Sequence, residues 1–220
     1  MTSRTFVRAR RPEQKQQRRA DILAAARELA LRDGVRNVTL GGVAAAVGLA
    51  KSNVVRYFGT REEIYLVLAL EECRGFADEV TARLRAGGGR SELVDAFVET
   101  LMARPLLCDL LGHTTTSLEH NVSLEAAREY KTGFVDLVAE LGRVVAELNP
   151  GMTERDGIEL VGGTILVAGS VYQSERPPPT LAALYAQDPE LAARCALPFE
   201  PTMRRLVTIL AAGIAATRDE

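Results

Sequence analysis

Tryptophan is absent from the sequence, and aromatic residues make up only 5% of its 220 positions. A chain that is poor in aromatics and rich in alanine and leucine favours helices over a β-sheet. Cysteine is scarce too: Cys73, Cys108 and Cys195 are odd in number and have no CxxC spacing. This usage argues against a disulfide framework and a zinc motif, and it indicates a reducing compartment.

Long apolar runs are also missing. The longest uncharged stretch, 160–174, has 15 residues and is rich in glycine, whereas a membrane-spanning helix needs roughly 20. No apolar segment follows the basic N-terminal residues, so a signal peptide is not expected. We therefore expect a cytoplasmic protein without a membrane partner.

The signatures of common enzymes are absent as well. The sequence has no GxSxG, GxxxxGKS/T, HExxH or CxxC motif, and its two histidines and scattered acids define no catalytic set. Asp109, His113 and His120 follow one helix face, which allows either a metal site or hydrogen-bonded histidines. Because no third strong ligand recurs at suitable spacing, we expect no metal, no cofactor and no enzymatic activity.

Charge is distributed unevenly along the chain, although the formal net charge is only −2. Residues 1–61 hold 13 Lys and Arg against 4 Asp and Glu, whereas residues 62–220 hold 14 against 25. A basic first part on an acidic remainder fits a protein whose N-terminal region meets a polyanion. A merely solvated surface of uneven charge is the alternative, and charge alone does not decide between them.

Three helices are predicted in the basic region, after a flexible arginine-rich arm at 1–13. The first, about 14–33, has apolar residues at helical spacing and ends before a glycine. The second starts at Thr39, whose hydroxyl can cap it. Two glycines in its first turn either admit a phosphate to the helix N-terminus or mark a frayed end. Gly48 then turns the chain into a third helix, about 51–57.

The third helix has one apolar side and one polar side. Val54 and Phe58 share a face that would pack on the first two helices. The opposite side combines a hydroxyl, an amide and a guanidinium with a methyl-bearing and a phenolic side chain, a set suited to base edges and phosphates in a major groove. A short exposed helix after a glycine turn is typical of the helix-turn-helix. Its exposed side holds Ser52, Asn53, Val55, Arg56 and Tyr57.

Residues 18–68 resemble the DNA-binding domain of TetR-family transcriptional regulators. The resemblance implies that the third helix enters the major groove and that the first-turn threonine of the second helix contacts a phosphate. It also implies an all-α fold, in which a helical ligand-binding and dimerisation domain follows the DNA-binding domain. The matching positions are Ile22, Ala25, Ala26, Leu29, Gly34, Thr39, Val43, Ala44, Gly48, Lys51, Tyr57, Phe58, Thr60, Arg61 and Glu62.

Three positions depart from the family pattern. Ala50 stands where a capping serine is usual, so the third helix lacks a side-chain cap. Val55 replaces a common tyrosine and offers a thymine methyl group an apolar partner, and Ser52 replaces a frequent glycine. Arg61, in the first turn of the next helix, is a phosphate candidate because arginine there does not suit the helix dipole. The expected DNA-contacting set is Thr39, Lys51, Ser52, Asn53, Val55, Arg56, Tyr57, Arg61, Arg10 and Arg11.

The DNA-binding domain is expected at 14–61, and the rest of the chain, 62–220, is expected to be a second, helical domain. Two of its helices carry small or apolar residues at helical spacing, and these form either a dimer interface, which a palindromic operator requires, or internal core. A stiff proline-rich loop is predicted at 175–180. The expected helices are 91–103, 105–120, 123–148, 153–173 and 200–217, and the expected interface residues are Gly162, Leu166, Gly169, Leu206, Leu210 and Ile214.

An effector pocket is expected among the helices at 91–173, although each candidate liner taken singly fits ordinary core better than a pocket wall. The candidates are Phe97, Met102, His113, Thr116, Phe134 and Tyr172. The sequence thus predicts a dimeric, ligand-responsive repressor that binds a palindromic double-stranded DNA operator and a largely apolar small molecule. A DNA-binding activator or architectural factor without an effector is the alternative.

Overall fold

The computed structural model describes residues 5–87 and 90–217, apart from the side chains of 5–12, 90 and 91. All secondary-structure elements in this part of the chain are helices, which confirms the predicted all-α class. The elements are α1 (Thr5–Asp33), η1 (Val35–Asn37), α2 (Leu40–Ala46), α3 (Lys51–Val55), α4 (Arg61–Ala86), α5 (Arg90–Met102), α6 (Pro105–His113), η2 (Thr114–Leu118), α7 (Leu124–Leu148), α8 (Glu154–Ser174), α9 (Pro179–Gln187), α10 (Pro189–Cys195) and α11 (Phe199–Ala216).

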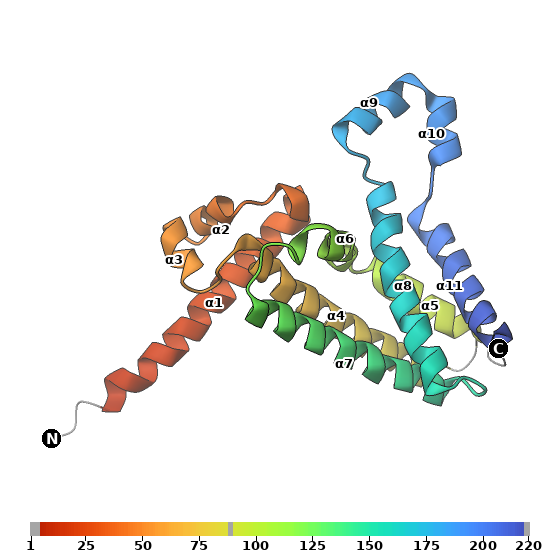
Figure 1. Ribbon diagram of the computed structural model, residues 1–220, viewed down its shortest axis with the longest axis horizontal. Helices are drawn as coiled ribbons and strands as arrows, with labels where there is room; N and C mark the ends of the chain where they lie inside the picture. The colour runs from red at the N-terminus through yellow and green to blue at the C-terminus, as the bar shows by residue number, and fades with distance from the viewer. Residues whose placement is uncertain (1–4, 88–89, 218–220) are drawn as a thin grey trace.

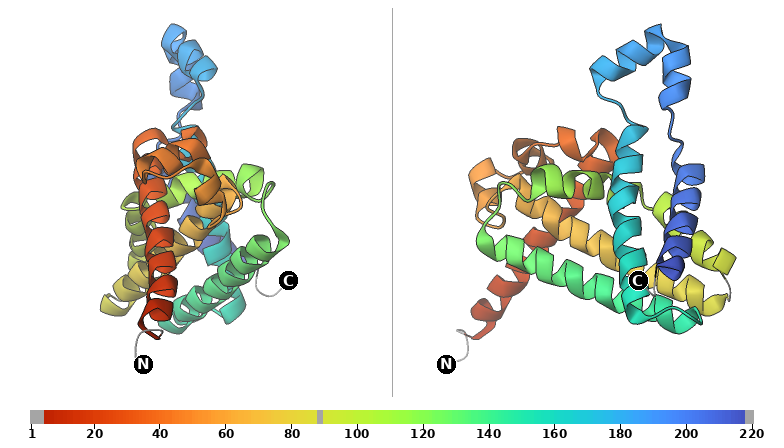
Figure 2. Two further views of the ribbon diagram at one scale, coloured as in Figure 1. Left: turned by 90° about the vertical axis from the view of Figure 1, so that its left-hand side faces the viewer. Right: turned by 45° about the vertical axis from the view of Figure 1, so that its right-hand side comes forward.

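The molecule has a small N-terminal part and a larger helical body. We call residues 5–60, with α1, η1, α2 and α3, the head, and residues 61–217 the body. In Figure 1 the head lies at one end, α4 and α7 run side by side away from it, and α8 and α11 pair at the other end. The right view of Figure 2 shows the same arrangement, with the head at one end and α8 and α11 at the other.

Capping and turn residues shape the head as the sequence predicts. The Thr39 hydroxyl oxygen accepts the Gly42 N–H at 3.0 Å and so caps α2. Gly48 has a φ of 64°, a conformation that glycine adopts without strain, and it turns the chain between α2 and α3. Val54 and Phe58 are buried, which confirms the predicted packing side of the third helix.

The first helix is longer than predicted. It begins at Thr5, so the expected arm at 1–13 is helical from its fifth residue. Residues 13–18 are all exposed and carry no apolar stripe, so hydrophobic periodicity does not mark where this helix begins. Gln, Lys, Arg and Glu dominate this stretch, and they favour helix through intrinsic propensity alone.

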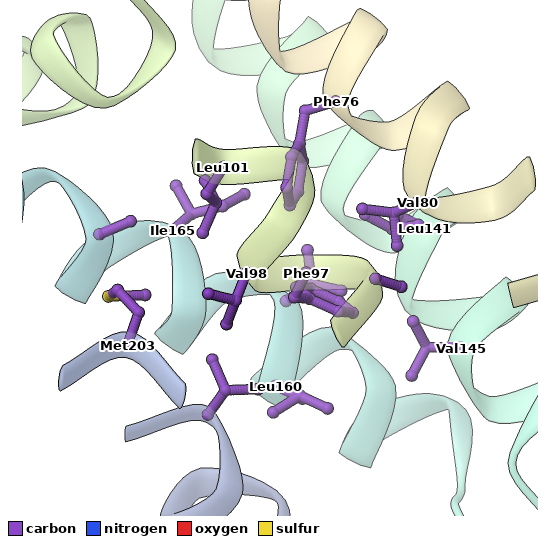
Figure 3. Packing of buried hydrophobic residues seen from close by; sticks show 14 of the residues in the cluster. Phe76, Val80, Phe97, Val98, Leu101, Leu141, Val145, Leu160, Ile165 and Met203 are labelled. Atoms are coloured by element: carbon purple, nitrogen blue, oxygen red, sulfur yellow. The ribbon is translucent and has the colours of Figure 1, made fainter. Parts of the chain in front are cut away.

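Two apolar cores hold the fold together. Figure 3 shows the body core, where Phe97 packs edge-on against Phe76 with ring centroids 5.8 Å apart. The second core is shared: Ile22 and Val54 of the head lie in one cluster with Tyr65 of α4 and with buried residues of α6, η2 and α7. The expected boundary at residue 61 therefore does not divide one core from the other.

Glycines let α8 pack very closely on two neighbouring helices. A Cβ atom added at Gly169 would lie 2.6 Å from the backbone nitrogen of Gly112 in α6. One added at Gly142 in α7 would lie 2.6 Å from the backbone nitrogen of Ile158 in α8. Gly169 was expected in the dimer interface, but it is buried against α6 within the subunit, because only a side chain of hydrogen permits this approach.

The helices α9 and α10 were not predicted, and α9 begins at Pro179 inside the expected proline-rich loop. Pro179 and Pro189 occupy first-turn positions, where proline fits a helix. Asp188 caps α10 by accepting the Leu191 N–H at 2.9 Å. Figures 1 and 2 show the pair projecting beyond α8 and α11, and none of its residues is buried. The sequence features that indicate these two helices are their proline and aspartate residues at the N-terminal ends, and not an apolar stripe.

The three cysteines are unpaired: Cys73 and Cys108 are buried, and Cys195 is exposed. Burial raises the pKa of both Cys73 and Cys108 to about 12, so these thiols stay protonated and unreactive near neutral pH. Within the described ranges, no helix is long and apolar enough to cross a membrane.

Candidate functional site

The helix α3 presents the predicted polar surface to solvent, at the end of the molecule away from α8 and α11 (Figure 1). Val55 is 43% exposed beside these groups, and Tyr57 is half-buried. Ala50 begins α3 without any side-chain cap, as its departure from the family pattern predicts. The exposed polar residues are Lys51, Ser52, Asn53 and Arg56.

The helix α1 fixes the end of α3. Arg19 donates a hydrogen bond to the Tyr57 carbonyl oxygen at 3.3 Å, and its guanidinium carbon lies 4.1 Å from the centre of the Phe58 ring. This contact holds Tyr57 and the last turn of α3 in place. Thr39 is exposed at the start of α2 and uses its oxygen as a cap, so its hydroxyl hydrogen can still be donated to a phosphate.

Arg61 does not have the role expected of it. Its Nε donates to the Val38 carbonyl oxygen at 2.6 Å, its Nη2 donates to the Val35 carbonyl oxygen, and its Nη1 lies 2.9 Å from Glu62. The side chain is only 18% exposed. It joins α4 to η1 and to the residue after it instead of pointing outward, because the carbonyl oxygens of Val35 and Val38 accept its N–H groups.

The other expected cations belong to α1. The side chains of Arg10 and Arg11 lie outside the described part of the chain. Further along the same helix, Lys15 and Arg18 are exposed, and Arg18 lies 3.5 Å from Asp21. A row of basic residues therefore continues along α1.

The expected pocket residues do not converge on one site. Phe97 is fully buried in the body core, Met102 is 46% exposed on the surface, and Thr116 is exposed in η2. Phe134 stacks on Tyr130 with ring centroids 5.9 Å apart. Of the six, His113 and Tyr172 line one cavity together.

That cavity, which we call the junction cavity, lies between the head and the body and has a volume of about 750 Å³. One wall is the end of α1 with η1, and the other is α6, the end of α8 and three prolines. Ligand pockets in proteins span roughly 300–1,000 Å³. The lining residues are Ala30, Leu31, Arg32, Asp33, Gly34, Arg36, Asn37, Pro105, Leu106, Asp109, His113, Tyr172, Gln173, Arg176, Pro177, Pro178 and Pro179.

Asp109 connects the two walls of the junction cavity. One carboxylate oxygen accepts the Val35 N–H of the head at 2.7 Å, and the other accepts the side-chain amide of Gln173 in α8 at 2.8 Å. Gly34, with a φ of 82°, turns the chain so that the Val35 N–H meets this carboxylate. Sequence reasoning weighed Asp109 only as a metal ligand, because nothing in the pattern reveals a contact across 74 positions.

His113 lies in the same cavity, with its Nε2 atom 3.5 Å from an Asp109 oxygen. Burial holds the pKa of His113 below its ordinary value; Asp109 opposes this effect, and Arg61 and Arg36 add to it. His120, which was expected on the same helix face, is exposed beyond η2, because the change to π geometry breaks the helical register. Among the described residues, no group of three His, Cys, Asp or Glu is placed to hold a metal ion.

The expected interface residues fall into three groups. Leu166 of α8 is 69% exposed, and an added Cβ at Gly162 would meet nothing within 4 Å. On α11, Ile209 is 50% exposed although it was not predicted. Gly169 is internal, as described above, and half-buried side chains at the edge of the body core form the third group: Leu206, Leu210 and Ile214.

Comparison with known families identifies the fold. The family "Bacterial regulatory proteins, tetR family" matches residues 22–68, and "Tetracyclin repressor-like, C-terminal domain" matches residues 70–218. The chain belongs to the TetR family. It is thus a TetR-family transcriptional regulator with a C-terminal helical domain, as its sequence motifs implied. No curated protein matches it by sequence.

Solved structures of TetR-family proteins share the fold at low identity. FadR from Thermus thermophilus, a transcriptional repressor solved with lauroyl-CoA, is 21% identical with a TM-score of 0.56, over 89% of this chain and 94% of that one. FadR from Bacillus halodurans, a fatty acid degradation regulator, is 16% identical with a TM-score of 0.51, over 88% and 94%. FadR from Bacillus subtilis, solved with stearoyl-CoA, is 17% identical with a TM-score of 0.50, over 88% and 98%. Identities this low show a shared fold and nothing further.

Proposed function

We propose that this TetR-family regulator is a ligand-responsive repressor that binds a palindromic DNA operator as a homodimer. The observation that carries the proposal is the surface of α3, where a hydroxyl, an amide and two cationic groups are exposed on a helix that the head core holds from behind. These groups match the donor and acceptor pattern of base edges in the major groove.

The position of each residue indicates whether it would contact bases or phosphates. Ser52, Asn53 and Arg56 would read base edges, and Val55 would meet a thymine methyl group. Thr39, Lys51 and Tyr57 would hold phosphates, together with the basic residues of α1, Arg10 and Arg11 included. Arg61 leaves this set, because its donors are already bonded to Val35, Val38 and Glu62.

A homodimer would place two heads one DNA turn apart, roughly 34 Å, which a palindromic operator requires. The face of α8 and α11 supports such a dimer. It combines Leu166 and Ile209, both half or more exposed, with Gly162, which has open space above it. Apolar side chains beside small residues suit a two-fold helical interface.

Two observations support a small-molecule effector. The junction cavity has the volume of a ligand pocket and touches both the head and the body. Two structurally similar proteins, the FadR regulators from Thermus thermophilus and Bacillus subtilis, were solved with lauroyl-CoA and stearoyl-CoA. A cavity of this size argues against the alternative of an activator or architectural factor without an effector.

Selection from a random DNA pool tests the proposal. The full-length protein would be incubated with the pool at near-physiological salt, and the bound fragments would be sequenced over several rounds. Enrichment of a two-fold palindrome would support a dimeric sequence reader. Binding without an enriched motif, lost as salt rises, would show phosphate contacts alone and would refute the reading role of α3.

A further inference from the structure

The junction cavity has walls that belong to different parts of the molecule. The end of α1 and η1 form the wall from the head, whereas α6 and the end of α8 form the wall from the body. The cavity therefore has this shape only while the head keeps this position on the body. A ligand that fits it would favour this head position over any other, because a ligand shifts an equilibrium only through differential affinity.

The charges on the cavity lining favour an anion. Arg32 is neutralised by Asp33 at 2.6 Å, and Asp109 already accepts two N–H groups. Arg36 has no carboxylate partner among the described residues. Arg176 has only a distant one, 4.0 Å away in Glu175. Two guanidinium groups are thus left to meet a ligand, from opposite walls.

Apolar surface lies beside these two cations. Leu31 is 57% exposed within the lining, and Leu106 and three consecutive prolines complete it. The guanidinium of Arg176 lies 3.6 Å from the centre of the Tyr172 ring, which restrains the side chain before any ligand binds. A ligand that matches both features has an anionic group and an apolar body.

Asp109 gives the cavity a route to the head. Its carboxylate is 12% exposed and holds the Val35 N–H of η1 and the Gln173 amide of α8 together. Besides the shared apolar core and the Arg61 bonds, this contact and Arg27 of α1 hold the head on the body; Arg27 pairs with Glu71 of α4 at 3.0 Å and with Glu72 beside it. A ligand that displaces Gln173 or the end of α1 would therefore change the position of η1 on α6, and the rest of the head would move with η1.

We propose that the junction cavity is the effector site, that it takes an organic anion with an apolar body, and that Asp109 transmits its occupancy to the head. This inference rests on the proposed ligand-responsive function. The anionic group could be a carboxylate or a phosphate, since guanidinium binds both.

Calorimetry on the full-length protein tests the site without DNA. Three probes share one alkyl chain and differ at its end: decanoate, decanoyl-CoA and decan-1-ol. We expect at least one of the two anions to bind about tenfold or more tightly than the alcohol, and Arg36→Gln and Arg176→Gln each to weaken that anion about tenfold. Arg155→Gln is the matched control: Arg155 lies at the opposite end of α8, is 87% exposed, and should leave binding unchanged.

The anion that binds identifies the source: decanoate indicates a carboxylate ligand, and decanoyl-CoA alone indicates a phosphate-bearing one. Equal binding of decan-1-ol, no binding of either anion, or unchanged affinity in both arginine variants would overturn the site. Circular dichroism melting of each variant would verify that it is folded. These readouts do not depend on DNA binding, so they separate failure of the site from failure of the proposed function.

Operator binding at saturating anion tests the coupling. The wild-type affinity for DNA should change at least about fivefold when the anion is added. In Asp109→Asn that ratio should fall towards one, because one of the two accepting oxygens is replaced by an NH2 donor and the negative charge is lost. A wild-type ratio of one would refute the coupling, and so would an undiminished ratio in Asp109→Asn and in a second variant, Gln173→Leu. A further outcome is that the two arginine variants bind the anion as tightly as the wild type and still release DNA when it is added. That result would support the proposed repressor function but would show that the effector binds outside the junction cavity.

Discussion

Leu166 is the sharpest probe of the proposed subunit interface, because 69% of its surface is exposed in the single subunit. Burying a whole leucine side chain contributes about 1.5–3 kcal/mol. Scaling by the exposed fraction gives about 1–2 kcal/mol for each subunit, and the two-fold axis doubles this to about 2–4 kcal/mol. Leu166→Lys removes this term and adds two charges that the interface must desolvate.

We expect the dimer dissociation constant to rise by about 30- to 700-fold, because each 1.4 kcal/mol corresponds to a factor of ten. The two desolvated charges would add to this increase. Folding of the subunit should change by less than about 0.5 kcal/mol, because the site is largely exposed before association. Sedimentation equilibrium over a dilution series measures the first quantity. Urea unfolding of the dissociated protein at high dilution measures the second.

Val135→Lys provides the matched control. Val135 is 60% exposed, but it lies on α7, outside the face formed by α8 and α11. It should leave dimerisation unchanged. A folded Leu166→Lys protein that dimerises within threefold of the wild type would refute the interface, as would equal weakening by both substitutions.

Four further changes give independent predictions. Arg56→Ala should weaken binding to the preferred operator by about 1–3 kcal/mol per site and binding to random DNA by less. Arg10→Ala should weaken binding to both DNAs equally and lower the salt dependence of binding. If fluorescence anisotropy shows the same behaviour for both variants, Arg56 does not read base edges. Arg61→Met should destabilise the fold by about 1.5–3 kcal/mol in urea unfolding, because two carbonyls lose a charged donor, while the salt slope of DNA binding stays unchanged. Gly169→Ala should cost about 1–3 kcal/mol through overpacking on α6, and Ser170→Ala next to it should be neutral; equal melting temperatures would contradict the close packing. Burial lowers the pKa of His113 in the folded state, so the unfolded state binds the proton first and stability should fall as pH drops below about 6.5; His113→Gln should flatten this part of the stability profile.

The head could be predicted almost completely from the sequence, because its signals are local. Thr39 caps the next helix, Gly48 adopts the turn conformation, and Val54 and Phe58 sit on one side of a short helix. Each of these depends on residues within a few positions. The start of α1 was misplaced for the complementary reason, since a solvent-exposed helix needs no apolar stripe.

The junction cavity, which we propose as the effector site, could not be predicted from the sequence, because it depends on contacts between distant residues. Arg36 lies in η1, Asp109 in α6 and Arg176 just after α8, and the packing of α6 against both η1 and α8 brings them together. That packing rests on Gly112 and Gly169, and the sequence analysis placed Gly169 in the dimer interface. Of the six predicted pocket residues, His113 and Tyr172 line the junction cavity, whereas the other four were chosen by residue type alone and do not line it.

The apolar core that the head shares with α4, α6 and η2 has a consequence for how the protein can be divided. Its members include Val54 and Phe58 from the head and Leu110, Leu118 and Tyr130 from the body. A cut after residue 61 would bare both halves of this cluster, so the isolated head would lack part of its own interior. Swapping this head onto a relative's body would therefore require the contacting residues of α4, α6, η2 and α7 to be exchanged with it, so the smallest transferable unit that contains the head extends into the body.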